Sequence, residues 1–272
     1  MVAVALLSAK GSPGVTTATL ALSTAWPEVH ANRRVLVAEC DPTGGDIASG
    51  YLRGGLDGSR GLAALAAQRS TDPLAAVWEQ VLALDDEGRR LLLPGLPDPR
   101  QAAGIGSAWS TLASAFDGLG QQDPPIDVLL DLGRMRTMHE PAALRQRVDL
   151  VVLVTRSSLP AVVAARAAAT ELAAPAADGR PAQVTCLVVG EGRPYSATEI
   201  SEAIALPVVG ALPYDTASAA AFSSGAVGGR RLARSPLLRS ARALAAALFE
   251  ESGSTARELK LTDAPTVGAG RG

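Results

Sequence analysis

The hydrophobic positions of the chain fall into short apolar runs, separated by longer stretches with helical spacing. The runs are continuously apolar rather than alternating, which is typical of strands that are covered on both faces of a sheet. The predicted strands span residues 2–9, 34–40, 126–133, 149–155, 183–190 and 206–213. Residues 89–95 predict a further strand, at an edge of the sheet and ended by Pro94.

Between these runs, apolar residues recur every three or four positions, the period of an amphipathic helix. The predicted helices span residues 16–26, 60–69, 74–84, 102–116, 159–173, 196–205 and 235–251. In the last helix Ser235 suits the N-cap and Pro236 the first turn. The alternation of strand and helix predicts one α/β domain over residues 1–251, with a doubly wound, mostly parallel sheet. The polar, glycine-rich residues 252–272 are predicted to be a disordered tail.

The composition of the chain argues against several classes of protein. The formal net charge of −2 over 272 residues gives no general electrostatic argument for binding nucleic acid or an anionic membrane. Cys40 and Cys186 lie in apolar runs and match no metal-ligand spacing, which indicates a reducing compartment. There is no apolar run of about 18 residues and no signal-peptide pattern. We therefore expect a cytoplasmic protein without a transmembrane segment.

Residues 9–17, which read AKGSPGVTT, follow the first predicted strand and lead into a helix. The phosphate-binding template G-x-x-x-x-G-K-[ST] is met at Gly14 and Thr16, but its first glycine is absent and Val15 replaces its lysine. The glycines still allow successive N–H groups to point inward, and the helix N-terminus attracts anions. The loop is thus either a phosphate site or a plain turn between strand and helix.

Carboxylates follow two of the predicted strands. Glu39, Asp41 and Asp46 lie at and beyond the end of strand 34–40, and Asp131 lies near the end of strand 126–133. Ligands of open α/β sheets bind at the carboxyl ends of the strands. Mg²⁺ in phosphate-transfer sites is held by a few carboxylates together with the phosphates. The sequence therefore favours a Mg²⁺–nucleotide site over a plain turn.

These motifs together resemble the ParA/MinD group of deviant Walker-A ATPases, in the SIMIBI class of P-loop NTPases, whose loop is K-G-G-x-G-K-[ST]. The resemblance covers residues 1 to about 250 and implies ATP and Mg²⁺ as cofactors. It places the nucleotide on Lys10, Gly11, Ser12, Pro13, Gly14, Val15, Thr16, Thr17 and Pro213. It places Mg²⁺ on Thr16, Glu39 and Asp131, and catalysis on Lys10 and Asp41.

Three positions depart from the family pattern. Ser12 replaces a glycine, Val15 replaces the loop lysine, and Gly190 stands where the family often has an asparagine that reads adenine. Loss of the lysine removes a charge that neutralises the transition state. Whether the chain hydrolyses ATP is therefore open, and we expect weak or absent turnover. The retained Lys10 is one of only two lysines, against 23 arginines.

The resemblance implies a nucleotide-dependent homodimer that positions or organises a larger assembly through an unidentified protein partner. Residues 131–134, which read DLGR and run past the end of strand 126–133, resemble the CpaE/TadZ branch, which is linked with pilus and secretion systems. One alternative is a chromosome or plasmid partition ATPase that binds DNA. Another is a pseudo-ATPase scaffold that hydrolyses nothing. The arginines of residues 230–242 are more simply explained as a solvated helix face than as a DNA site.

Overall fold

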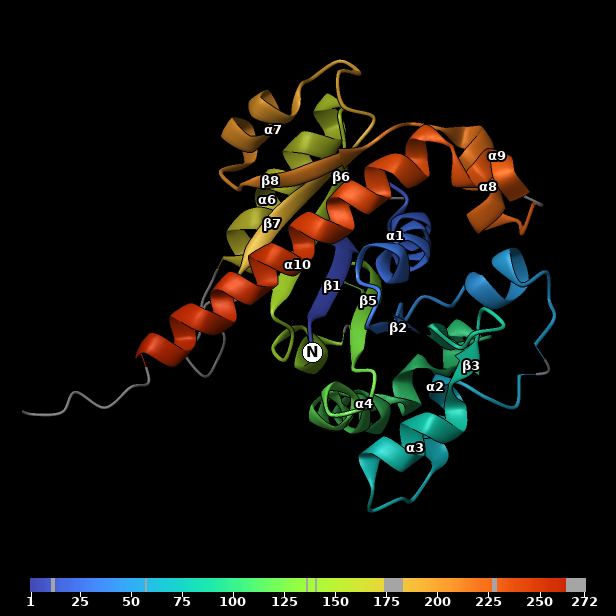
Figure 1. The fold of residues 1–272 in the computed structure, drawn as a ribbon. Helices are drawn as coiled ribbons and strands as arrows, with labels where there is room; N and C mark the ends of the chain where they lie inside the picture. Colours follow the sequence, from blue (N-terminus) through green and yellow to red (C-terminus); the bar gives the residue numbers. More distant parts are fainter. Residues whose placement is uncertain are drawn as a thin grey trace, which may run out of the picture.

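The computed structural model describes residues 1–10, 13–56, 58–135, 137–139, 141–173, 183–226 and 229–262. In these residues one sheet has the strand order β3-β4-β2-β5-β1-β6-β7-β8 (Figure 1). Neighbouring strands are parallel, except that β3 pairs with β4 in the antiparallel direction. The strands are β1 (Ala3–Ser8), β2 (Arg34–Glu39), β3 (Leu82–Ala83), β4 (Arg90–Leu93), β5 (Ile126–Arg134), β6 (Leu150–Arg156), β7 (Val184–Val189) and β8 (Val208–Leu212).

Helices lie on both faces of this sheet, as Figure 1 shows. They are α1 (Val15–Val29), α2 (Leu62–Ala67), α3 (Pro73–Gln80), α4 (Gly106–Gly120), α5 (Ala142–Arg145), α6 (Leu159–Leu172), α7 (Ala197–Ile204), α8 (Thr216–Ser223), α9 (Gly229–Ala233) and α10 (Pro236–Thr262). A π-helical turn η1 (Ile47–Tyr51) and a 3₁₀ turn η2 (Pro99–Gly104) complete the described elements. The prediction of a single, doubly wound α/β domain is confirmed.

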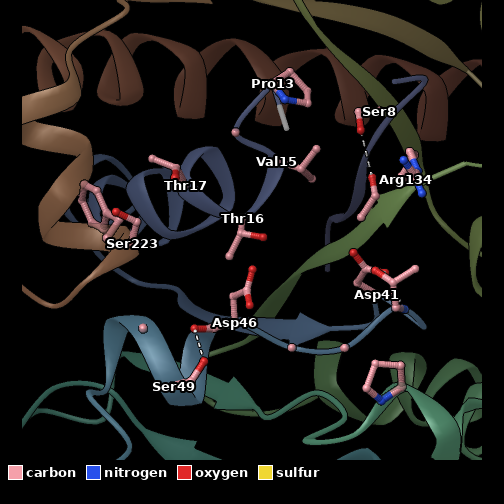
Figure 2. Close-up of a pocket in the computed structure, with 18 of the residues that line it drawn as sticks. Ser8, Pro13, Val15, Thr16, Thr17, Asp41, Asp46, Ser49, Arg134 and Ser223 are labelled. Carbon is pink, nitrogen blue, oxygen red and sulfur yellow. Dashed lines mark hydrogen bonds between the residues drawn. The ribbon is translucent and has the colours of Figure 1, made fainter. Parts of the chain in front are cut away.

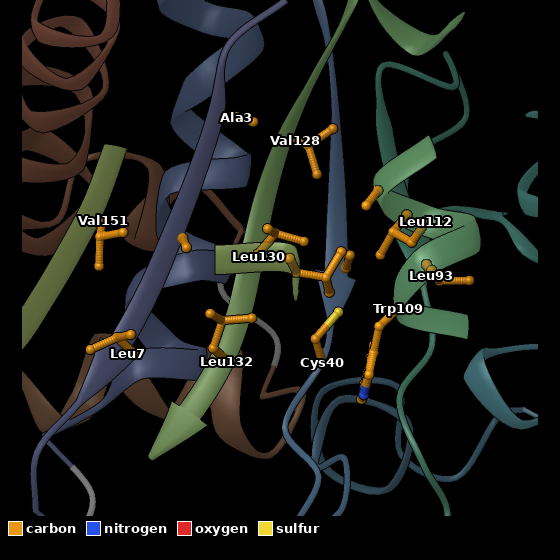
Figure 3. Close-up of a cluster of buried hydrophobic side chains, with 14 of the residues drawn as sticks. Ala3, Leu7, Cys40, Leu93, Trp109, Leu112, Val128, Leu130, Leu132 and Val151 are labelled. Atoms are coloured by element: carbon orange, nitrogen blue, oxygen red, sulfur yellow. The ribbon is translucent and has the colours of Figure 1, made fainter. Parts of the chain in front are cut away.

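The central strand β1 explains why its sequence is continuously apolar. Successive side chains of a strand point to opposite faces, so Ala5 and Leu7 join one buried core while Val4 and Leu6 join the other. The first core includes α4 and α6, and the second includes α1 and α10. Figure 3 shows part of the first core, where residues of several strands lie together with residues of α4.

At the amino-terminal end of the sheet, a buried carboxylate joins several elements. Asp127 of β5 accepts hydrogen bonds from the backbone N–H of Val2 at 2.7 Å and from Nε1 of Trp26 at 2.9 Å. It also pairs with two nitrogens of Arg33, each at 2.6 Å. Nearby, the side chain of Asp149 accepts the N–H of Ala3 at 2.8 Å. Asp127 therefore links the start of β1 and the end of α1 to the start of the central strand β5.

Four local predictions need correction. The helix predicted over 74–84 ends at Gln80, because residues 82–83 pair as the antiparallel edge strand β3. Consequently β4 is paired on both sides and is not an edge strand. The helix predicted over 102–116 is divided between η2 and α4. Helix α10, which Ser235 caps at Leu238 as predicted, continues to Thr262 rather than ending at residue 251; of the predicted tail, residues 263–272 lie outside the described residues.

Candidate functional site

The carboxyl ends of β1, β2 and β5 meet at one edge of the sheet, beside a cavity of about 890 Å³ (Figure 2). This volume lies within the range of small-molecule sites. The lining comes from the start of α1, the loop after β2, the end of β5 and the end of α8. The lining residues that carry polar side chains are Ser8, Thr16, Thr17, Asp41, Thr43, Asp46, Ser49, Arg134 and Ser223.

The loop before α1 has the geometry of an anion site where the structure describes it. Gly14 adopts φ 100°, a left-handed conformation that glycine accepts without strain, and α1 begins at the next residue. The first residues of α1, whose N–H groups have no partner within the helix, line the cavity together with Gly14. Gly11 and Ser12, which are predicted to bind nucleotide, lie outside the described residues.

Val15 occupies the position of the missing lysine. Its side chain lines the cavity in part but is only 6% exposed, because it packs into the core that α1 forms with α10. The position therefore supplies no cation to a bound phosphate. Lys10 is exposed and is absent from the cavity lining. Its predicted contact with the nucleotide and its predicted catalytic role stay predictions.

Asp131 is fully buried at the end of β5. Its Oδ1 accepts the N–H of Gly133 at 3.0 Å, whereas its Oδ2 has no hydrogen-bond partner in the described part of the chain. Burial raises the pKa of Asp131 to about 6, while the Thr16 hydroxyl and the Gly133 amide favour the charged form. An unpaired buried carboxylate oxygen is costly. It fits a site in which a cation or its bound water supplies the missing partner.

Asp41 lies in the loop after β2 and packs against the end of β5. Its Oδ1 accepts the N–H and the hydroxyl of Thr43, at 2.8 and 2.6 Å. Gly133 has φ 64°, and a Cβ on it would overlap the Asp41 carboxylate. Glycine at position 133 therefore allows Asp41 to approach Asp131, and the negative charge of Asp41 contributes to the raised pKa of Asp131, after the larger effect of burial.

Glu39 is buried at the end of β2 and is bonded to backbone amides. Its Oε1 accepts the N–H of Ile47 at 2.8 Å and its Oε2 accepts the N–H of Gly95 at 2.9 Å. Burial, opposed by these amides, raises the pKa of Glu39 to about 7. Both oxygens accept backbone amides and the residue is absent from the cavity lining, so Glu39 joins two loops. Its predicted contact with Mg²⁺ stays a prediction.

Asp46, which was not among the predicted metal or catalytic residues, lines the cavity instead of Glu39. Figure 2 shows its side chain below Thr16. The sequence carried a signal for it, since Asp46 lies in the same strand-end loop as Asp41. No group of three or more His, Cys, Asp or Glu side chains in the described residues is arranged to hold a metal alone. Mg²⁺ commonly binds one or two carboxylates together with substrate phosphates, so this donor set fits Mg²⁺ that arrives with a nucleotide.

Pro213 follows β8 and does not line this cavity; its predicted nucleotide contact stays a prediction. The next residue, Tyr214, has the guanidinium groups of Arg156 and Arg193 at 5.3 and 5.8 Å from its ring centre. Gly190 has φ 77°, and a Cβ there would be 3.2 Å from Cβ of Tyr214. An asparagine at position 190 would therefore be strained and crowded, which explains why glycine suits this packing.

Neither a protein-family model nor a curated protein sequence matches the chain. Solved structures do match. MinD from Pyrococcus horikoshii OT3, complexed with Mg-ADP, has a TM-score of 0.72 at 17% identity, over 93% of this chain and 98% of that chain. The chain has the MinD/ParA fold. A ParA family ATPase from Chlorobium tepidum TLS has a TM-score of 0.70 at 16% identity, over 90% of this chain and 97% of that chain.

A further structure with the MinD/ParA fold is the ATP complex of Cyanothece McdA(D38A), with a TM-score of 0.62 at 14% identity, over 93% of this chain and 96% of that chain. The predicted fold family is thereby confirmed from spatial similarity alone. Helix α10 is the longest described helix, and no helix in the described residues is both long and apolar enough to cross a membrane.

Proposed function

We propose that the chain is a ParA/MinD-like protein that binds Mg²⁺–ATP at the β1–α1 loop and, as a nucleotide-dependent homodimer, positions or organises a larger assembly in the cytoplasm. The observation that carries this proposal is the unpaired, buried Oδ2 of Asp131 close to Thr16, at the anion-binding start of α1. A plain turn between strand and helix needs no such orphaned carboxylate oxygen.

In the proposed site, different residues of the cavity bind the phosphates, Mg²⁺ and water. The amides at the start of α1 would bind phosphate oxygens. The Thr16 hydroxyl and Asp131 would hold Mg²⁺, which supplies positive charge beside the phosphates when it is bound. Asp41 and Asp46 line the part of the cavity formed by the loop after β2, where their carboxylates can orient water. None of these contacts with phosphate, Mg²⁺ or water involves the side chain of Val15.

Two further functions are tied to particular residues. The buried Val15 favours a pseudo-ATPase scaffold as the second candidate, because no lysine stabilises the transition state. Residues Gly133 and Arg134 of the DLGR run support a pilus or secretion system as the assembly, through the resemblance to the CpaE/TadZ branch. A partition ATPase stays an outcome of the test below rather than a proposal.

Calorimetric titration with ATP and ADP, each with and without Mg²⁺, tests the proposed function. We expect Mg²⁺-dependent binding, with turnover at saturating ATP well below about one per second, the lower end of typical enzyme rates. Turnover at or above that rate would contradict the role of Val15, and stimulation of it by DNA would favour a partition ATPase. Complete absence of nucleotide binding would contradict the proposed function and favour the pseudo-ATPase scaffold. The Val15→Lys variant should raise ATP affinity if the loop is otherwise intact.

Dimer formation should depend on Lys10. The ammonium group lies on an exposed residue at the rim of the loop, so it can reach a second subunit rather than its own cavity. A nucleotide held between two copies would then increase dimer formation by mass action. We expect a non-hydrolysable ATP analogue to shift the sedimentation coefficient toward that of a dimer, and Lys10→Ala to remove the shift while circular dichroism stays unchanged. A monomeric wild type at saturating analogue, or a variant that dimerises as well as wild type, would refute the role of Lys10.

A further inference from the structure

A second pocket, of about 340 Å³, lies between α1, η1, β4 and the segment that contains α8 and α9. Figure 1 shows α8 and α9, in orange, side by side above the light-blue helical turn that follows β2. Phe222 lies in the lining of this pocket and of the larger cavity, so the two are neighbours. The lining residues of the second pocket are Thr24, Tyr51, Leu52, Leu84, Arg90, Ala221, Phe222, Gly225, Ala226 and Leu232.

Most of this lining is apolar and well supported. Leu52, Leu84 and Leu232 are partly buried and pack against the core beneath α1 and α10. The ring of Tyr51 stacks on that of Phe222, with 6.3 Å between ring centres and 25° between planes. These contacts hold the walls of the pocket, while part of each leucine still faces its interior. The walls of the pocket can therefore pack against a small apolar group.

Arg90 places a cation in this apolar surrounding. Its Nη2 donates two long hydrogen bonds, at 3.3 Å, to the neutral hydroxyl groups of Ser23 and Tyr51. Its Nε is buried and has no hydrogen-bond partner in the described part of the chain. The carboxylate of Asp85, close in sequence, accepts the backbone amides of Arg89 and Arg90 instead.

The contrast with Arg33 shows what Arg90 lacks. Arg33 pairs with the carboxylate of Asp127 at 2.6 Å, whereas no ion pair of Arg90 is present among the described residues. A partly buried guanidinium without an anion lowers the stability of a protein, because its lost hydration is not replaced. Such a group is well placed to receive an anion from outside, and its planar donors suit a carboxylate or a phosphate.

We propose that this second pocket binds a small organic anion with a compact apolar body. The carboxylate or phosphate monoester group pairs with Arg90 and accepts a hydrogen bond from the hydroxyl of Tyr51. The apolar body of the ligand packs on Leu52, Leu84 and Leu232. The volume suits a ligand at the small end of the usual range. The site is separate from the β1–α1 loop, so the inference goes beyond the proposed function and does not depend on it.

Three probes test this site in protein without nucleotide: phenylacetate, phenyl phosphate and the uncharged phenylacetamide. We expect both anions to raise the thermal unfolding midpoint with increasing concentration, and the amide to leave it unchanged. Saturation-transfer NMR should detect contact between the phenyl group and the protein for the anions. Phenyl phosphate can also reach the β1–α1 loop, so phenylacetate is the deciding probe.

Substitutions assign the binding to this pocket. Arg90→Met should weaken phenylacetate binding by about tenfold or more, as loss of a charged hydrogen bond predicts, and Arg90→Lys should restore part of it. Tyr51→Phe, which keeps the ring stack, should weaken binding less. Arg89→Met is the matched control: Arg89 donates to the backbone oxygens of Pro27 and Ala31, so its loss should lower the midpoint but keep the probe-induced shift.

Three results would overturn the inference. The first is equal binding of phenylacetate and phenylacetamide, which would show that charge is not recognised. The second is unchanged phenylacetate affinity in both Arg90→Met and Tyr51→Phe, which would place the probe elsewhere. The third is no detectable binding by any probe up to about 10 mM, a concentration at which even weak sites are occupied.

Discussion

Asp131→Asn is expected to reduce the enhancement of ATP affinity by Mg²⁺ by about tenfold to a hundredfold, the usual effect of changing a residue that supports a metal. The asparagine keeps an oxygen for the N–H of Gly133 and removes the charge from the unpaired position. The fold should persist, because one neutral group replaces a carboxylate whose burial already raises its pKa to about 6. Calorimetry gives the ratio of ATP affinities with and without Mg²⁺.

Glu39→Gln is the matched control for this variant. We expect it to leave the ratio of ATP affinities with and without Mg²⁺ unchanged. We expect it to lower the free energy of unfolding by about 1–3 kcal/mol. The reason is that an amide nitrogen would face the N–H of Ile47 or of Gly95, where a carboxylate oxygen now accepts. Equal loss of the ratio in both variants would show that Glu39 also acts on the metal. Unfolding of Asp131→Asn would show that Asp131 is structural.

Asp127→Ala is expected to lower the free energy of unfolding by about 3–5 kcal/mol, the typical cost of breaking one half of a buried ion pair. The substitution leaves the guanidinium of Arg33 without its partner and two further donors, on Val2 and Trp26, without an acceptor. The Asp127 hydrogen bond is the main reason that the pKa of Arg33 is raised. Urea unfolding at neutral pH measures the change through the midpoint at constant slope.

Asp149→Ala serves as the comparison, since Asp149 lies at the same end of the sheet and its side chain accepts the N–H of Ala3. Loss of one such bond is expected to cost about 1 kcal/mol. Equal losses in the two variants would show that the contacts of Asp127 add nothing to stability beyond a single hydrogen bond. The comparison thus separates a multiply bonded carboxylate from a singly bonded one.

The pattern of apolar residues predicted the parallel strands well, and it failed at a short hairpin, in which Leu82 pairs with Leu92. Residues 74–84 have helical spacing throughout, yet residues 82–83 leave the helix because β4 offers them an antiparallel partner. The same pairing moves β4 away from the edge of the sheet. A periodicity describes which face is apolar, and it contains no information about which strand will lie beside it.

By itself, the sequence determined the alternation of buried strands and helices, the glycine-containing loop before α1, and the absence of a lysine at Val15, because each is a local property of neighbouring residues. Only the tertiary structure decided which strand-end carboxylates face the cavity. Glu39 turns to the amides of Ile47 and Gly95 while Asp46 lines the cavity, although both lie near the end of the same strand. The unpaired positions of Asp131 and Arg90 are likewise invisible in sequence, since a missing partner is a fact about all the residues that surround a side chain in space.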